Sequence, residues 1–217
     1  MGRVGRLQQQ LADARGGRVV LLSHCLLNEN VRYLGGADRA RGVQEVVDSF
    51  LPRGVGIYQL PCPEQRAWGG VLKRWMLLAY GSGGTHRAPA VRLLLGTFLR
   101  YTKIVFAQLA RAVTRDVLDY RRAGVEVVGI VGIGGSPSCG VRTTLDLPTA
   151  VNVLTRYPCA RLDRRTVNED VVAASTCPGQ GLFVCALRRR LARAGVVVPF
   201  EEHALPNGPV ICWRIDP

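Results

Sequence analysis

The chain has 217 residues, of which 47% are hydrophobic, and its formal net charge is +13. This length and apolar content suffice for one sizeable core, so we expect a single domain over residues 1–217. The sequence has no uninterrupted apolar run of about 18 residues, and residues 1–18 carry charges without an apolar stretch. A membrane-spanning helix and a secretory signal peptide are therefore not expected, and we predict a cytoplasmic protein without a membrane partner.

Hydrophobic periodicity predicts alternating strands and helices along the chain. After a short polar helix or arm in residues 1–16, strands are expected at 18–23, 54–60, 125–133, 196–200 and 210–213. Helices are expected at 38–50, where Asp38 could be the N-cap, and at 88–122, 168–174 and 181–193, of which 88–122 could be one long helix or two joined ones. Between them, residues 65–87 suggest an irregular excursion that could cover a site. The alternation predicts an α/β fold with an open, mostly parallel sheet and helices on both faces, in a three-layer, Rossmann-like arrangement.

The positive charge alone does not indicate a nucleic-acid partner. Only Lys73 and Lys103 are lysines, and the arginines are spread along the chain without a basic tail or an aromatic-interleaved stripe. A GC-rich coding sequence would produce the same bias toward arginine. A basic RNA-associated protein stays an alternative, but nucleic acid is not the partner that we expect.

Three cysteines follow predicted strands. Cys25 comes after RVVLLS, Cys62 after GVGIYQL, and Cys139 lies in the SPSCG loop after VEVVGIVGI. Ligands of open parallel sheets bind outside the carboxyl ends of the strands, so neighbouring parallel strands would bring these thiols together. Three cysteines with an open fourth position suit a catalytic metal or a cluster with one exposed iron.

The remaining cysteines give weaker signals. The chain has seven cysteines and no C-x-x-C pair, which argues against a disulfide scaffold, a zinc ribbon and a thioredoxin motif. A free cysteine is often a small buried hydrophobic residue, and this interpretation fits Cys185 and Cys212. Cys177 lies in a turn and could approach the site. If the chain is extended at His24, its side chain points away from that of Cys25, so His24 is expected beside the site instead of among the ligands.

Glycines at 129–135 (GIVGIGG) also invite a dinucleotide-binding interpretation. A dinucleotide fingerprint needs its third glycine at the start of a helix, whereas Ser-Pro-Ser-Cys follows here. The sequence therefore does not predict a nucleotide cofactor.

Three motifs in order resemble the thiouracil desulfidase family. Residues 23–28 (SHCLLN) with Val31-Arg32-Tyr33 are similar to its S-x-C-L-L-G-x-x-x-R-Y opening, and PCPE at 61–64 followed by Gly69-Gly70 is similar to its C-P-E-x-x-G-G block. Residues 136–140 match its S-P-S-C-G loop. His24, Asn28 and the longer segment before the glycines depart from the pattern, as in a divergent branch of related proteins with S-H-C-x-L-N openings.

The resemblance implies a 4Fe–4S cluster held by Cys25, Cys62 and Cys139, with one iron left open. It also implies removal of sulfur from a small thiocarbonyl substrate such as a thio-base, with release of hydrogen sulfide and no net electron transfer. The open iron would act as a Lewis acid that polarises the C=S bond while water attacks the carbon.

Five further residues near these motifs are candidate site residues. Glu64 could be the general base or a substrate anchor, or else a carboxylate that stabilises a helix N-terminus. Ser136 is expected to assist catalysis and Ser138 to bind substrate, although both could cap the loop. Arg32 and Tyr33 could reach a substrate carbonyl or phosphate, and Arg32 could equally be a surface ion-pair partner. An iron–sulfur, zinc or thiol sensor without turnover is the main alternative function.

Overall fold

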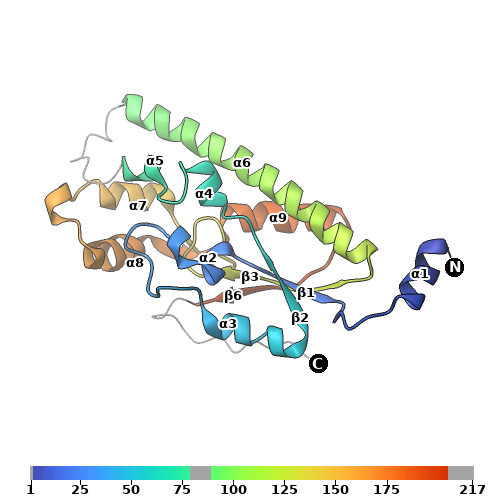
Figure 1. Ribbon diagram of the computed structural model, residues 1–217. Coiled ribbons are helices and arrows are strands. Elements are labelled where there is room, and N and C mark those ends of the chain that lie inside the picture. The colour runs from blue at the N-terminus through green and yellow to red at the C-terminus, as the bar shows by residue number, and fades with distance from the viewer. Residues whose placement is uncertain (1, 79–88, 205–217) are drawn as a thin grey trace.

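The computed structural model describes residues 2–78 and 89–204 (Figure 1). Its centre is a four-stranded sheet in the order β2-β1-β3-β6, in which every neighbouring pair is parallel. The strands are β1 (Arg18–Leu22), β2 (Val55–Gln59), β3 (Glu126–Ile133) and β6 (Phe200–His203). The predicted α/β fold with a parallel sheet is confirmed, and the three strands that precede the cysteines are neighbours.

Helices cover both faces of this sheet. The long helix α6 (Pro89–Arg122) and α9 (Leu182–Arg193) pack together on one face, and α3 (Gln44–Asp48) lies on the other (Figure 1). The N-terminal helix α1 (Arg3–Gln10) projects from this body. Shorter helices connect the strands: α2 (His24–Leu27), η1 (Glu29–Val31), η2 (Leu51–Arg53), α4 (Pro63–Ala67) and α5 (Arg74–Leu77). No helix in the described part of the chain is long and apolar enough to cross a bilayer.

The core lies between the central sheet and the helices that cover it. Four consecutive residues of β1, from Val19 to Leu22, are buried because helices cover both faces of this central strand. On α6, Phe106, Ala110, Val113 and Val117 recur at helical spacing and are fully buried against the sheet layer. Full burial of a valine or phenylalanine side chain, such as those of Val113 and Phe106, stabilises the fold by roughly 1.5–3 kcal/mol.

A smaller unit, which we call the side lobe, comprises residues 143–178. It contains β4 (Thr143–Leu145) paired antiparallel with β5 (Thr176–Pro178), the helices α7 (Leu147–Leu154) and η4 (Cys159–Arg161), the π-helix η5 (Thr166–Val172) and α8 (Ala173–Ser175). Its own small core joins Ala150, Leu154 and Val171. The lobe lies beyond the carboxyl ends of the strands (Figure 1).

Three predicted elements differ in extent or type from those observed. The helix expected at 168–174 is the π-helix η5, which α8 continues. The helix expected at 38–50 is restricted to α3, because the Glu29 carboxylate accepts hydrogen bonds from the backbone N–H groups of Asp38 and Arg39 and holds that stretch as a loop. The strand expected at 196–200 begins only at Phe200, since Pro199 has no N–H to donate. The strand expected at 210–213 and residues 79–88 of the predicted excursion lie outside the described residues.

Candidate active site

The three strand-end cysteines line one cavity at the carboxyl edge of the sheet. Cys25 is on α2 directly after β1, Cys62 is the N-cap residue of α4 after β2, and Cys139 is in the loop after β3. All three belong to the lining of a cavity of about 1020 Å³. Cys62 and Cys139 are buried, and Cys25 is half-buried. The parallel order of β2, β1 and β3 therefore brings together residues that are distant in the sequence.

Burial keeps these thiols protonated when no cation is bound. It raises the pKa of Cys25 to about 12 and that of Cys62 to about 11, with the nearby Glu64 carboxylate adding to both shifts. Burial also raises the pKa of Cys139 well above its usual value, and the neighbouring Cys25 and Cys62 raise it further. Thiols of this kind become thiolates when a metal displaces their protons.

The surroundings of the sulfur atoms fit an iron–sulfur cluster. Ser23 Oγ is buried without a hydrogen-bond partner, yet it lies close enough to Cys139 to lower the pKa of that thiol. Ser138 Oγ donates to Cys139 Sγ at 3.6 Å, and the backbone N–H of Gln65 donates to Cys62 Sγ at 3.4 Å. Donors directed at cysteine sulfur are the contacts that tune cluster thiolates. Among the described residues, no group of three or more His, Cys, Asp or Glu side chains is arranged to hold a metal ion.

Glu64 enters the cavity from the first turn of α4. Pro63 suits the first helical position and Cys62 caps the helix, so the local sequence places Glu64 where the chain turns inward. Glu64 Oε1 accepts hydrogen bonds from Ser138 Oγ at 2.8 Å and from Ser136 Oγ at 3.4 Å. The residue is therefore both a carboxylate at a helix N-terminus and part of the cavity wall.

The sequence interpretation missed Lys73. Its Nζ lies 3.0 Å from Glu64 Oε2 and donates to the Val31 carbonyl at 2.7 Å, and only 5% of its side chain is exposed. Its backbone is left-handed, with φ of 50°, which is the only positive φ among the described non-glycine residues. The sequence held one signal that could have pointed to Lys73 as a site residue: it is one of only two lysines in an arginine-rich chain.

The loop that carries Cys139 is fixed by the protein around it. Ser136 Oγ accepts from the Cys139 backbone N–H at 3.0 Å and thus caps the turn. Glu202 Oε2 accepts from three successive backbone N–H groups, at residues 141–143, at 2.6–3.0 Å. Burial alone would raise the pKa of Glu202, but these hydrogen bonds lower it below its usual value. At Gly181, a Cβ atom would lie 2.4 Å from the Ser138 backbone, so the close packing of α9 against this loop requires glycine.

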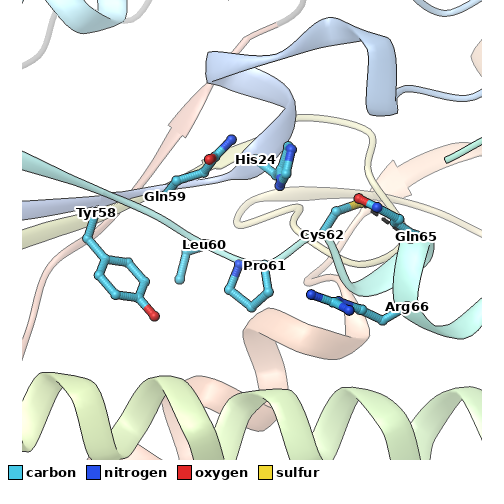
Figure 2. A pocket seen from close by; sticks show the side chains of 8 residues that line it. All are labelled: His24, Tyr58, Gln59, Leu60, Pro61, Cys62, Gln65 and Arg66. Carbon is cyan, nitrogen blue, oxygen red and sulfur yellow. Dashed lines mark hydrogen bonds between the residues drawn. The ribbon is translucent and has the colours of Figure 1, made fainter. Parts of the chain in front are cut away.

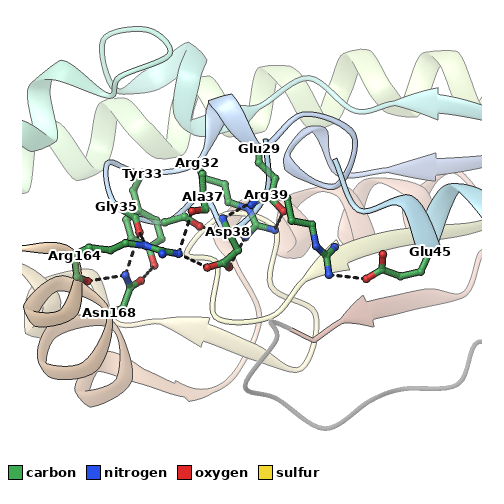
Figure 3. Close-up of polar contacts among 11 residues, drawn as sticks. Glu29, Arg32, Tyr33, Gly35, Ala37, Asp38, Arg39, Glu45, Arg164 and Asn168 are labelled. Atoms are coloured by element: carbon green, nitrogen blue, oxygen red, sulfur yellow. Dashed lines mark hydrogen bonds and ion pairs between the residues drawn. The ribbon is translucent and has the colours of Figure 1, made fainter. Parts of the chain in front are cut away.

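Arg32 and Tyr33 line the cavity, but their polar groups contact the protein itself (Figure 3). Arg32 pairs with Glu29 Oε1 at 3.2 Å and with Asp38 Oδ2 at 3.3 Å, and its Nε is buried without a partner. Tyr33 OH donates to Asn168 Oδ1 of the side lobe at 2.5 Å. The sequence predicts both as substrate-binding residues, and the structure adds that they help to hold the loop at 29–39.

The side lobe is joined to this loop by a few polar contacts. Arg164 pairs with Asp38 and donates to the carbonyls of Gly35 and Ala37, both at 3.1 Å. Asn168 Nδ2 donates to the Gly35 carbonyl at 3.0 Å. Figure 3 shows these side chains converging on the loop from η5 and from the segment before it. The lobe therefore closes one end of the cavity that the cysteines line.

His24 and Cys62 also line a second, smaller cavity of about 320 Å³ (Figure 2). His24 is the first residue of α2, so our assumption of an extended chain at this point was wrong. Burial lowers the pKa of His24, and the charge of Arg66, another residue of this second cavity, lowers it further. Cys177 pairs with Thr144 between β4 and β5 and is not among the described residues that line either cavity.

Part of the chain is similar to a known archaeal protein. A segment of 51 residues is 45% identical to the uncharacterized protein MJ0003 of Methanocaldococcus jannaschii. The match covers 23% of this chain and 32% of that relative, so the chain spans about a third of the length of the relative. No family model and no solved structure matches the chain.

Proposed function

We propose that this protein is an iron–sulfur-dependent desulfidase that removes sulfur from a small thiocarbonyl compound and releases hydrogen sulfide. The observation that carries the proposal is the shared cavity: three cysteines from three parallel strand ends lie in one lining with a buried carboxylate and two serine hydroxyls. The resemblance of the three motifs to the thiouracil desulfidase family supports it. The cytoplasm, where thiols stay reduced, is the compartment that we expect for such a site.

In this proposal Cys25, Cys62 and Cys139 hold a 4Fe–4S cluster. When bound, the cluster supplies a Lewis acid, since three protein ligands leave one iron open to the soft thiocarbonyl sulfur. Ser23 would donate a hydrogen bond to this group of sulfur atoms because its hydroxyl lies beside Cys139, whereas the single hydroxyl proton of Ser138 is directed to Glu64 Oε1 at 2.8 Å.

The reaction is a hydrolysis in which the electrons balance without a redox partner. The C=S bond breaks, a C=O bond forms with the oxygen of water, and both water protons end on sulfur as hydrogen sulfide. Glu64 would accept the first proton from the attacking water and later pass it to the departing sulfur. Lys73 holds Glu64 Oε2, so Oε1 stays directed toward Ser136 and Ser138, which would orient the water or the product carbonyl.

The cluster is tested by anaerobic purification with iron and acid-labile sulfide assays on wild type and on Cys139→Ala. We expect about four irons and four sulfides per chain in wild type and loss of both in the variant. Cys185→Ala is the matched control, since this half-buried cysteine contacts Gln180 away from both cavities. Stoichiometric zinc, or no iron after reconstitution, would contradict the proposal.

Turnover is tested by sulfide release from a panel of thio-bases and thioamides. Glu64→Gln leaves Lys73 without its buried partner, so it is assayed under conditions in which circular dichroism shows it folded; there it should retain its iron and lose about 10²–10⁴-fold in rate, as expected for removal of a general base. Glu126→Gln, at an exposed position at the opposite end of β3, should retain the wild-type rate. Unchanged sulfide release in Glu64→Gln with a full cluster would contradict the assigned role. A full cluster in wild type with no release from any member of the panel would favour a sensor.

A further inference from the structure

The cavity has two chemically different ends. The cysteines, Glu64 and the two serines of the SPSCG loop lie at one end, where the strands stop. The other end is walled by apolar side chains of the side lobe: Leu145, Leu147, Ala150, Val151, Leu154, Val167, Val171 and Val172. A cavity of about 1020 Å³ lies at the upper limit of the range of about 300–1,000 Å³ that encloses drug-sized ligands. The cluster of the proposed function would take the part beside the cysteines, but a single thio-base ring next to it would leave the side-lobe end unfilled.

The charged residues of the cavity wall are already paired within the protein. Among the described residues, each arginine in the lining has a carboxylate partner: Arg32 pairs with Glu29 and Asp38, Arg142 with Glu201, Arg164 with Asp38, and Arg165 with Glu169. Lys73 pairs with Glu64. The pairs of Arg142, Arg164 and Arg165 are largely exposed and therefore weak, whereas the side chains of Arg32 and Lys73 are buried with their partners Glu29 and Glu64. A ligand phosphate in the buried part of the cavity would have to compete with these two carboxylates for its cation, whereas a neutral ligand would leave the buried pairs intact. The buried part of the wall therefore favours a neutral ligand over a nucleotide.

The apolar end is formed before any ligand binds. Val151 and Val172 are half-buried in the lining and lie on the elements α7 and η5, which the small core of Leu154 and Val171 packs together, and Asn168 and Arg164 fix this unit to the loop at 35–38. A preformed apolar wall reduces the ordering cost of binding. η5 is also a π-helix, a conformation that is frequent at functional sites.

From these observations we propose that the substrate is a neutral thiocarbonyl compound whose body is mostly apolar and larger than one ring. The body occupies the side-lobe end of the cavity, and the C=S group reaches the cysteines, Glu64 and the serines. The C=S group in this inference rests on the proposed function, whereas the preference for a neutral, apolar ligand follows from the shape and charge of the cavity alone. The proposal separates this protein from enzymes that act on free thio-bases or thio-nucleotides.

The first test measures binding without turnover, by titration calorimetry on the full chain. Benzanilide, which carries two phenyl rings on an amide, serves as a stable oxygen analogue of thiobenzanilide. We expect it to bind at least tenfold more tightly than uracil, which fills only the polar end, and than uridine monophosphate. Tighter binding of the nucleotide than of benzanilide would overturn the proposal.

Two variants locate the bound body. Val151→Trp places a bulky ring in the apolar end and should weaken benzanilide binding at least tenfold while uracil binding stays unchanged. Asn152→Trp is the control, because Asn152 is on the same helix, is exposed and is not part of the cavity lining. Val172→Trp, from η5, gives a second test of the same wall should Val151→Trp fail to fold. Equal effects of the lining and control variants on benzanilide would overturn the proposal.

The proposed function and the proposed ligand class fail in different ways. If the ligand class is wrong, benzanilide fails to bind in preference to uracil, whatever the iron content. If the desulfidase function is wrong, benzanilide still binds in the side-lobe end, but thiobenzanilide releases no sulfide from an iron-loaded protein.

Discussion

Replacement of Lys73 by methionine tests the buried ion pair that orients Glu64. Only 5% of the Lys73 side chain and 11% of the Glu64 side chain are exposed, so solvent screens this pair far less than a surface pair. Removing one partner of a buried pair leaves an uncompensated charge, which typically costs about 3–5 kcal/mol. The variant also removes the hydrogen bond from Lys73 Nζ to the Val31 carbonyl. The cost of this lost bond is already contained in the cost of removing the charged partner, so the two are not summed. Against a total stability of about 5–15 kcal/mol for a domain, Lys73→Met should be severely destabilising.

Urea unfolding followed by circular dichroism measures this effect. Lys103→Met is the matched control, because Lys103 is the other lysine of the chain and is exposed on α6, and it should change the free energy of unfolding by less than about 0.5 kcal/mol. The double variant Lys73→Met with Glu64→Gln should be more stable than the sum of the single losses predicts, by about 1–3 kcal/mol. A loss below about 1 kcal/mol for Lys73→Met, or strict additivity in the double variant, would refute this reasoning.

Three further predictions concern the structures that support the site. Glu202→Gln should lower the free energy of unfolding at pH 7 by about 1.5–3 kcal/mol. Because the pKa of Glu202 is lowered in the folded protein, wild type should lose this extra stability as the pH falls below 4.5 and through the folded pKa. Equal urea midpoints of wild type and Glu202→Gln at pH 7 would contradict the stabilising role of the Glu202 carboxylate. Tyr33→Phe should cost about 1 kcal/mol by removing the bond to Asn168, and an unchanged melting temperature would exclude that role. Gly181→Ala should reduce iron incorporation on anaerobic reconstitution, since its Cβ would displace the Cys139 loop, whereas full incorporation would show that the loop tolerates the shift.

The sheet and the convergence of the cysteines could be predicted because both depend on local signals. Compact apolar runs identified β1, β2 and β3, and the geometry of parallel strands then placed their carboxyl ends at one edge. The long helix α6 was predictable from periodicity alone, since its apolar residues recur on one face.

Apart from the helix expected at 168–174, the side lobe and the polar network could not be predicted in this way. β4 and β5 are three residues each, too short to give a periodic signal, and their pairing depends on contacts between distant segments. The first part of the helix expected at 38–50 is a loop, because Glu29 accepts a hydrogen bond from the Asp38 backbone N–H and Asp38 pairs with Arg32. These are tertiary contacts, which local periodicity does not reveal. The pairing of Lys73 with Glu64 likewise depends on how the chain after α4 folds back toward η1.

Because each cysteine follows a different strand, the cavity lining at the carboxyl edge exists only after the sheet has assembled. An unfolded chain holds Cys25, Cys62 and Cys139 far apart, and closing both intervening loops carries an entropic cost. A ligand that needs all three thiols therefore binds the native chain in strong preference to the unfolded chain, and bound ligand adds to the free energy of unfolding by mass action. Maturation of such a protein would follow folding, in contrast to C-x-x-C sites, where neighbouring thiols can capture metal before the fold forms.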